Sequence, residues 1–141
     1  MGYTWSKGAD AVLEHTAVDW DGVWSLLYAA GKGTFRLSLQ LPLDVGAELA
    51  YAGMDICEAR DEVSWAHPEV PLTAIAVDLG PIGPVIDLPA TTAVLVGLLD
   101  AAFDRLTVLQ DADPDPDARS LSRQITWRVR SAREAIQELA R

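Results

Sequence analysis

The sequence predicts an all-α fold: one domain, residues 1–141, built as a bundle of four main helices with a short fifth element. Apolar side chains recur every three or four residues along four long segments, which is the spacing of an amphipathic helix. Capping and helix-breaking residues stand at several ends of these segments. The chain has 141 residues, half of them apolar, so it can bury a core without disulfides or structural metals.

The first helical segment covers residues 8–30, whose apolar side chains fall on one arc of a helix. Gly31 and Gly33 are expected to end this helix, because glycine is common just past a helix C-terminus. The motif Asp-Trp-Asp-Gly inside the segment is a candidate break. In that case Asp19 or Asp21 would cap a second helix.

Residues 34–41 alternate polar and apolar side chains without a fault, which is typical of a strand. The obvious partner is segment 72–79, and the two would form a small hairpin. This hairpin is the α+β alternative to the all-α fold. Segment 72–79 equally suits two turns of helix, started by Pro71 and ended by Gly80 and Pro81, which would be the short fifth element.

The clearest helix covers residues 45–64, and Asp44 is its expected N-cap. The proline- and glycine-rich stretch 79–89 is stiff and apolar, and it predicts a loop pressed against the core. Residues 90–110 form the most apolar helix, which we expect at the centre of the bundle.

An acidic loop at 111–117 precedes a basic amphipathic helix at the C-terminus, with Asp115 as N-cap and Pro116 as its first residue. Residues 1–118 hold 19 acidic and 5 basic side chains, a net charge of −14, whereas residues 119–141 hold 2 acidic and 6 basic ones, a net charge of +4. The favoured interpretation is that the basic helix packs on the protein's own acidic body. A basic arm for an external partner is the alternative.

The composition of the chain limits the partners that we expect for it and the cellular compartment in which we expect it. The net charge of −10 disfavours binding to nucleic acid. Cys57 is alone, so no disulfide can form within the chain, and this fits a reducing cytoplasm. The longest apolar run, 93–99, is too short to span a membrane. The absence of asparagine and the excess of arginine over lysine indicate a bacterial genome of high GC content.

Residues 13–24 gather a histidine, three carboxylates and two tryptophans. On one continuous helix His15 and Asp19 would lie one turn apart, and a histidine–carboxylate hydrogen bond could serve proton transfer. They are the candidate catalytic pair, and a stabilising surface pair is the simpler interpretation. Trp20 and Trp24 lie on the apolar face and are candidate ligand contacts, although core anchors or a dimer contact are favoured.

A column of carboxylates follows one face of the 45–64 helix, and its members are Glu48, Asp55, Glu58 and Glu62. Such a column could bind a hard cation, but a solvated helix face is the more common outcome. Glu58 and Asp61, spaced as Glu-x-x-Asp, resemble half of the motif of the all-α nucleotide pyrophosphohydrolases of the MazG type. The glutamate-rich partner helix of that motif is absent. No family, metal or cofactor is therefore assigned.

Arg60 projects from the apolar face of the same helix, where it could pair with a carboxylate inside the bundle. Asp100 and Asp104 on the central helix are the natural partners. A buried pair of Arg60 and Asp104 could orient a ligand, and a role in helix registry is the simpler interpretation.

The sequence holds no assembled catalytic set, so the leading hypothesis is a non-catalytic helical protein that acts by association, as a homo-oligomer or with a protein partner. The alternative is a small enzyme or ligand-binding protein. It would hold an apolar small molecule between helices, with His15 and Asp19, or Arg60 and Asp104, as polar contacts. A third hypothesis is an acidic inhibitor of a basic protein.

Overall fold

A computed structural model describes residues 4–82 and 86–139, and no strand occurs among them. The all-α prediction is confirmed. The helices are α1 (Thr4–His15), α2 (Trp20–Ser38), α3 (Leu43–Ala66), α4 (Val70–Thr73), α5 (Leu88–Ala112) and α6 (Pro116–Leu139).

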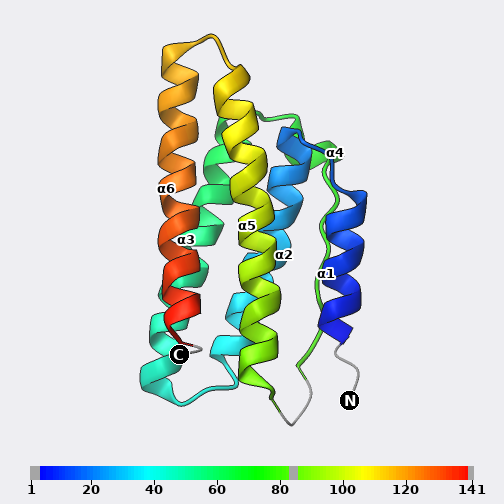
Figure 1. Cartoon of the computed structure of the whole chain (residues 1–141), viewed down its shortest axis with the longest axis vertical. Coiled ribbons are helices and arrows are strands. Elements are labelled where there is room, and N and C mark those ends of the chain that lie inside the picture. The colour runs from blue at the N-terminus through cyan, green and yellow to red at the C-terminus, as the bar shows by residue number, and fades with distance from the viewer. Residues whose placement is uncertain (1–3, 83–85, 140–141) are drawn as a thin grey trace.

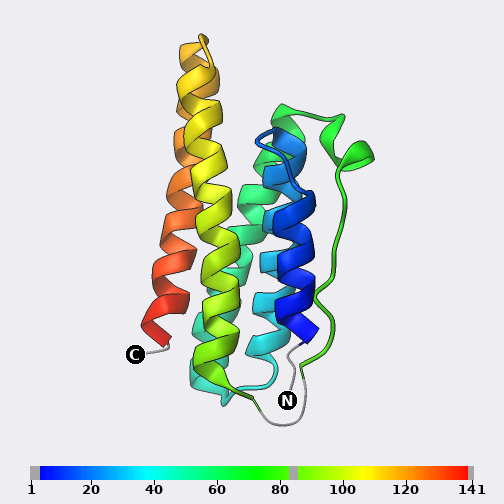
Figure 2. The same ribbon diagram turned by 45° about the vertical axis from the view of Figure 1, so that its right-hand side comes forward.

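Four long helices, α2, α3, α5 and α6, form the bundle (Figures 1 and 2). Going round it, α2 packs on α3, α3 on α6, α6 on α5 and α5 on α2, so that α3 and α5 lie on a diagonal. Each helix runs antiparallel to its two neighbours. A down-up hairpin of α2 and α3 therefore faces an up-down hairpin of α5 and α6.

A long crossover joins the two hairpins. After α4, the chain runs back along the length of the bundle beside α1, and α5 begins at the same end as α3 (Figure 2). We call residues 74–79 the crossover segment; they form neither helix nor strand. Helix α1 packs on α2 and α5 as a fifth helix outside the four-helix core. The crossover segment and α1 together cover one side of α2.

Burial follows the apolar faces that the sequence predicts for α5 and α6. On α5, Leu95, Leu98 and Leu99 are fully buried, and on α6 Ile125 and Ile136 are almost fully buried. Because all the long helices contribute to one continuous apolar cluster, the stability of the fold rests mainly on hydrocarbon burial. None of the described helices has the length and apolar character needed to cross a bilayer.

The first helical segment breaks at the predicted motif but does not end at the predicted glycines. The Asp19 carboxylate accepts a hydrogen bond of 2.7 Å from the amide of Gly22 and caps α2. Helix α2 then continues through Gly31 and Gly33 to Ser38. The reason is close packing, since a Cβ on Gly33 would lie 2.9 Å from Leu95 Cδ2. Glycine here admits a neighbouring side chain and does not terminate a helix.

The hairpin alternative is wrong. Residues 34–38 complete α2, and the Thr34 hydroxyl donates to the carbonyl of Ala30 at 2.7 Å, one helical turn back. Segment 72–79 contains the end of α4 and the crossover segment, without a ladder of hydrogen bonds to residues 34–41. Eight residues of alternation, 34–41, are too few to outweigh the continuation of a helix that is already formed.

Of the predicted starts of the later helices, the N-cap of α3 is wrong and the start of α6 is confirmed. Helix α3 begins at Leu43 with Pro42 in the cap position, so Asp44 lies in the first turn and is not the N-cap. Helix α6 begins at Pro116 as predicted, and the Asp115 carboxylate accepts from the amide of Asp117 at 3.0 Å.

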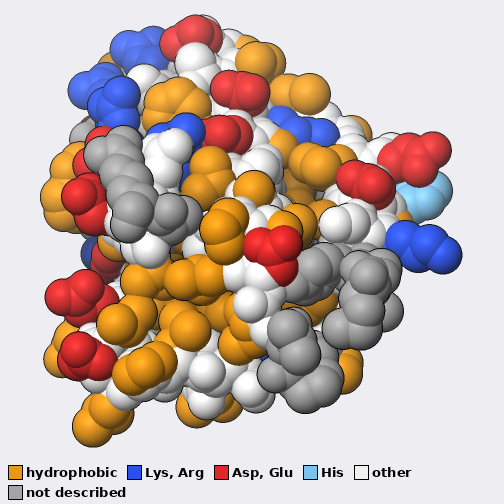
Figure 3. Space-filling view, turned by 60° about the horizontal axis from the view of Figure 1, so that its bottom comes forward, with side chains coloured by type: hydrophobic (Ala, Val, Ile, Leu, Met, Phe, Trp, Pro, Cys, Tyr) orange, Lys and Arg blue, Asp and Glu red, His pale blue; other side chains and the backbone are white. Residues whose placement is uncertain are grey.

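Apolar side chains also gather on one end of the bundle, at the turn between α2 and α3 and the start of α5 (Figure 3). Leu39 and Leu43 belong to this turn and are 84% and 88% exposed.

Candidate functional site

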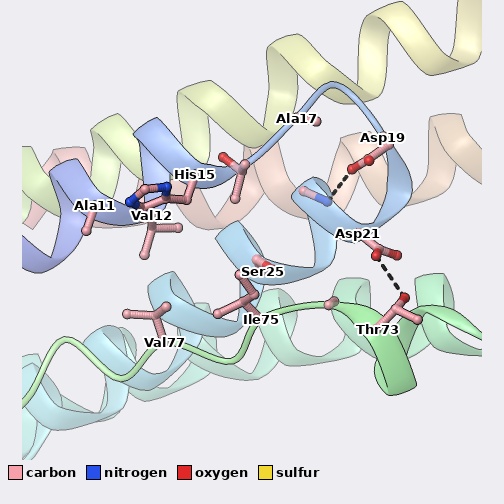
Figure 4. Close-up of a pocket in the computed structure, with 13 residues that line it drawn as sticks. Ala11, Val12, His15, Ala17, Asp19, Asp21, Ser25, Thr73, Ile75 and Val77 are labelled. Carbon is pink, nitrogen blue, oxygen red and sulfur yellow. Dashed lines mark hydrogen bonds between the residues drawn. The ribbon is translucent and has the colours of Figure 1, made fainter.

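A pocket of about 270 Å³ lies between the end of α1, the start of α2 and the crossover segment (Figure 4). We call it the α1–α2 pocket. Its polar lining consists of His15, Thr16, Asp19, Asp21, Ser25 and Thr73. Its apolar lining consists mainly of Ala11, Val12, Ala74, Ile75 and Val77.

The local sequence explains why the helices leave space here. Helix α1 ends at His15 and α2 begins at Trp20, so the intervening linker turns the chain around above the crossover segment. The linker is held from the other side by Arg105 of α5, which donates to the carbonyls of Thr16 and Ala17 at 3.2 and 3.1 Å. These bonds fix the linker against α5, and the two residues that they hold, Thr16 and Ala17, line the pocket.

Two aspartates stand where α2 begins. One oxygen of Asp19 is bound to the amide of Gly22, and one oxygen of Asp21 accepts from the Thr73 hydroxyl at 2.8 Å. The bond from Thr73 ties the start of α2 to the end of α4. No ion pair involves either carboxylate within the described part of the chain. Each aspartate therefore keeps one oxygen for another donor.

Ser25 is the most informative polar residue in the pocket. It lies one turn beyond Asp21 on α2 and is only 3% exposed, yet it lines the pocket. Its hydroxyl makes no hydrogen bond to any residue that the structure describes. Because the hydroxyl is accessible from the pocket, a polar atom bound there could form a hydrogen bond with it.

The apolar wall comes from two other elements. Val12 of α1 is 2% exposed, and Ile75 and Val77 come from the crossover segment (Figure 4). Asp19, Asp21 and Ser25 thus stand at or on α2, and most of the hydrocarbon comes from α1 and the crossover segment, although His15 and Thr73 add polar groups from α1 and α4. This division suits a molecule with one polar end and one apolar end.

The structure brings His15 and Asp19 to the same pocket, but by a different route from the one that the sequence predicts. They do not share a helix, because α1 ends at His15 and Asp19 caps α2. No hydrogen bond joins them, and Asp19 is committed to the cap. The histidine–carboxylate pair expected from a one-turn spacing is therefore wrong. Sequence reasoning also missed Ser25 and Thr73, since their place in the pocket depends on the path of the crossover segment.

The two tryptophans do not line the pocket. Trp24 is buried, stacks on Tyr28 with ring centroids 5.3 Å apart, and donates from Nε1 to the Ser64 hydroxyl at 3.0 Å. Trp20 stacks on His67 at 4.6 Å. Both rings anchor α2 to α3 and the turn that follows it. Trp20 and Trp24 thus make contacts of the kind expected of core anchors.

The proposed pair of Arg60 and Asp104 does not form. Arg60 donates to its neighbour Asp61, with Nη2 3.2 Å from Oδ1, and its guanidinium lies 5.8 Å from the centre of the Tyr28 ring. Asp104 is exposed on α5. The physical reason is topological, since α3 and α5 occupy diagonal corners of the bundle and α2 stands beside Arg60.

Part of the carboxylate column is neutralised by α6. Arg128 donates from Nε to Glu62 and from Nη1 to Glu58, both at 2.6 Å. Glu62 is buried, and its second oxygen has no hydrogen-bond partner within the described residues. Among those residues no group of three His, Cys, Asp or Glu side chains is arranged to hold a metal ion.

Asp55 in the same column supports a prediction about stability. Burial, and secondly the charge of Glu58, raise the pKa of Asp55 above its usual value. An acid whose pKa is raised by folding favours the fold at low pH and loses that contribution as pH rises through the folded pKa. Asp55→Asn should therefore raise the free energy of unfolding at pH 7 by up to about 0.5 kcal/mol.

Urea unfolding at pH 7 and at pH 3 tests this prediction, because the gain should vanish at pH 3, where Asp55 is protonated in both states. A gain of the same size at both pH values would show that charge is not its cause.

Comparisons with protein-family models, with curated proteins and with solved structures find no match to this chain.

Proposed function

We propose that this protein binds a small organic molecule in the α1–α2 pocket and does not transform it. The observation that carries the proposal is Ser25, which is 3% exposed and whose hydroxyl faces the pocket without a partner among the described residues. A polar atom of a ligand could form a hydrogen bond with this hydroxyl, and such a bond contributes about 0.5–1.5 kcal/mol. Of the three hypotheses drawn from the sequence, ligand binding is thus the best supported.

The size of the pocket limits the ligand. A volume of about 270 Å³ lies just below the usual range for sites that bind drug-sized molecules. A compact molecule of roughly ten non-hydrogen atoms suits it. At such a size, a dissociation constant on the order of 1 mM is expected for a generic fragment.

Binding without catalysis fits the disposition of the polar side chains. Asp19 is engaged as a helix cap, and Asp21 is bound to Thr73. His15 is exposed, and within the described residues its ring forms no ion pair with a carboxylate that would orient it. A general base needs an orienting partner and a reacting group within reach, and neither is supplied here.

The test is calorimetric titration with 2-phenylethanol, a neutral probe of suitable size. Ala11 is exposed at the pocket, and Ala11→Phe should block the pocket and weaken binding at least tenfold. Ala93→Phe places the same ring on an exposed position of α5 and should leave the affinity unchanged. Equal affinities for the wild type and Ala11→Phe would contradict the proposal.

A second candidate function is association with a protein partner or with a second copy. Trp65 of α3 and Trp127 of α6 are 78% and 65% exposed, and the two helices pack side by side. Exposed tryptophans are enriched in protein interfaces. Sedimentation should then show a complex that Trp65→Ala weakens, whereas a strict monomer in cell extract would contradict this candidate.

We also propose that the protein works in the cytoplasm of a bacterium. The single cysteine supports a reducing cytoplasm, and residue usage supports a bacterial source. The net charge of −10 supports a partner other than nucleic acid.

A further inference from the structure

We infer that the ligand of the α1–α2 pocket is an organic cation: a protonated amine carried on a compact apolar body. This inference rests on the proposed function and names the chemical class of its ligand. It is built from the charges that line the pocket, the hydrogen bonds already made there, and the buried hydroxyl of Ser25.

The charged side chains in the pocket favour a cation. Asp19 and Asp21 line it together with His15, and no lysine or arginine among the described residues does. The start of a helix carries roughly half a positive charge, which is smaller than the two negative charges of the aspartates. The local charge is therefore negative, although the pocket lies at a helix N-terminus.

An anion would find few free donors. The amide of Gly22 donates to the side chain of Asp19, and the amide of Val23 donates to its backbone carbonyl. Two of the N–H groups in the first turn of α2 are therefore not available to an anion. The Asp19 carboxylate thus binds an amide that could otherwise bind an anionic ligand.

The nearest arginine that the structure describes is committed elsewhere. Arg105 donates to the carbonyls of Thr16, Ala17 and Ala101, and to the Thr16 hydroxyl. It reaches the linker from α5 and binds two residues that line the pocket, Thr16 and Ala17, but does not line the pocket itself. The free oxygens of Asp19 and Asp21 are thus left without a cationic partner from the described part of the chain.

An ammonium group matches the acceptors on α2. It has three N–H donors and no acceptor, as a lysine side chain does. The acceptors that line the pocket are the free oxygen of each aspartate, at the end where α2 begins, and the Ser25 hydroxyl, which is set apart from them one turn further along α2 (Figure 4). The apolar body would then rest on Val12 and on the crossover residues Ile75 and Val77.

The experiment compares three probes of one shape near pH 7: 2-phenylethylammonium, 2-phenylethanol and phenylacetate. A hydrogen bond to a charged group is about twice as strong as a neutral one, so the cation should bind at least tenfold more tightly than the alcohol. Phenylacetate should bind more weakly than the alcohol, because like charges repel.

Two matched variants locate the effect. Asp21→Asn keeps an oxygen that can accept from Thr73 and removes the charge, so the preference for the cation over the alcohol should fall to threefold or less. Asp104→Asn removes one charge from an exposed site on α5 and should leave the preference unchanged. This control measures the attraction of a cation to the overall charge of −10.

Each outcome decides one of the two claims. If the alcohol or phenylacetate binds as tightly as the cation, or if Asp104→Asn acts as strongly as Asp21→Asn, the inference of a cation is overturned and the pocket stands. If none of the three probes binds, the proposed function itself is overturned.

Discussion

Replacing Arg128 with alanine should lower the free energy of unfolding by about 3–5 kcal/mol. Arg128 supplies the ion pairs to Glu58 and Glu62 that join α6 to α3. The side chain of Glu62 is only 8% exposed, and its second oxygen already lacks a partner within the described residues. Without Arg128, a buried carboxylate would lose its ion-pair partner, and this is more costly than the loss of a surface pair.

A matched comparison separates burial from charge. Arg36 and Asp78 form an ion pair in which both side chains are 38% exposed, and Arg36→Ala should cost far less than Arg128→Ala, because exposed ion pairs contribute little. Adding Glu62→Gln to Arg128→Ala should recover part of the lost stability, because the amide has no charge to bury. Urea unfolding measures all of these variants. A loss below 1 kcal/mol for Arg128→Ala would mean that Glu62 is well hydrated.

Trp5→Ala is the second substitution with a large expected effect, a loss of about 3–5 kcal/mol of unfolding free energy. Trp5 is 1% exposed, and its Nε1 donates to the carbonyl of Gly80 at 2.9 Å. Gly80 has a φ of 90°, a conformation that favours glycine. The indole therefore joins α1, the bundle core and the end of the crossover.

The variant Trp5→Phe distinguishes the packing of the ring from its hydrogen bond. Phenylalanine keeps most of the apolar area and loses the N–H donor, so its cost should be about 1–2 kcal/mol. Hydrogen exchange of Trp5→Ala should accelerate first in α1, because this helix depends on Trp5 for its anchoring. Equal and small losses for the two variants would contradict the role of Trp5 as an anchor.

The helices that sequence reasoning located best are those with long apolar periodicity. Helices α5 and α6 extend at most two residues beyond the segments whose periodicity predicts them. The start of α6 at Pro116 was predicted from the proline and from the preceding Asp115, whose effects on the backbone are local. Such signals act within one turn of helix, so they can be recognised without knowledge of the fold.

Features that depend on neighbouring elements were predicted poorly. Gly31 and Gly33 resemble helix stops, yet a glycine that admits a packed side chain has the same local appearance. The interpretation of Arg60 failed because helical periodicity gives the face of a helix but not the neighbour that covers it.

The candidate site was found only in part, for the same reason. His15 and Asp19 were selected because they are polar residues close together in sequence, and they do line the pocket. The other half of the pocket comes from residues 73–77, which approach α2 because the crossover returns along the bundle. Ser25 could not be chosen from the sequence, since a serine on a buried face is ordinary until a cavity is seen beside it.

The central claim is that the α1–α2 pocket is the binding site, and a titration followed by backbone amide NMR shifts is its most direct test. With 2-phenylethylammonium, saturable shifts should cluster at residues 12–25 and 73–77, and they should disappear in Ala11→Phe. Saturable shifts centred instead on the exposed tryptophans of α3 and α6, with none at residues 12–25, would contradict the account.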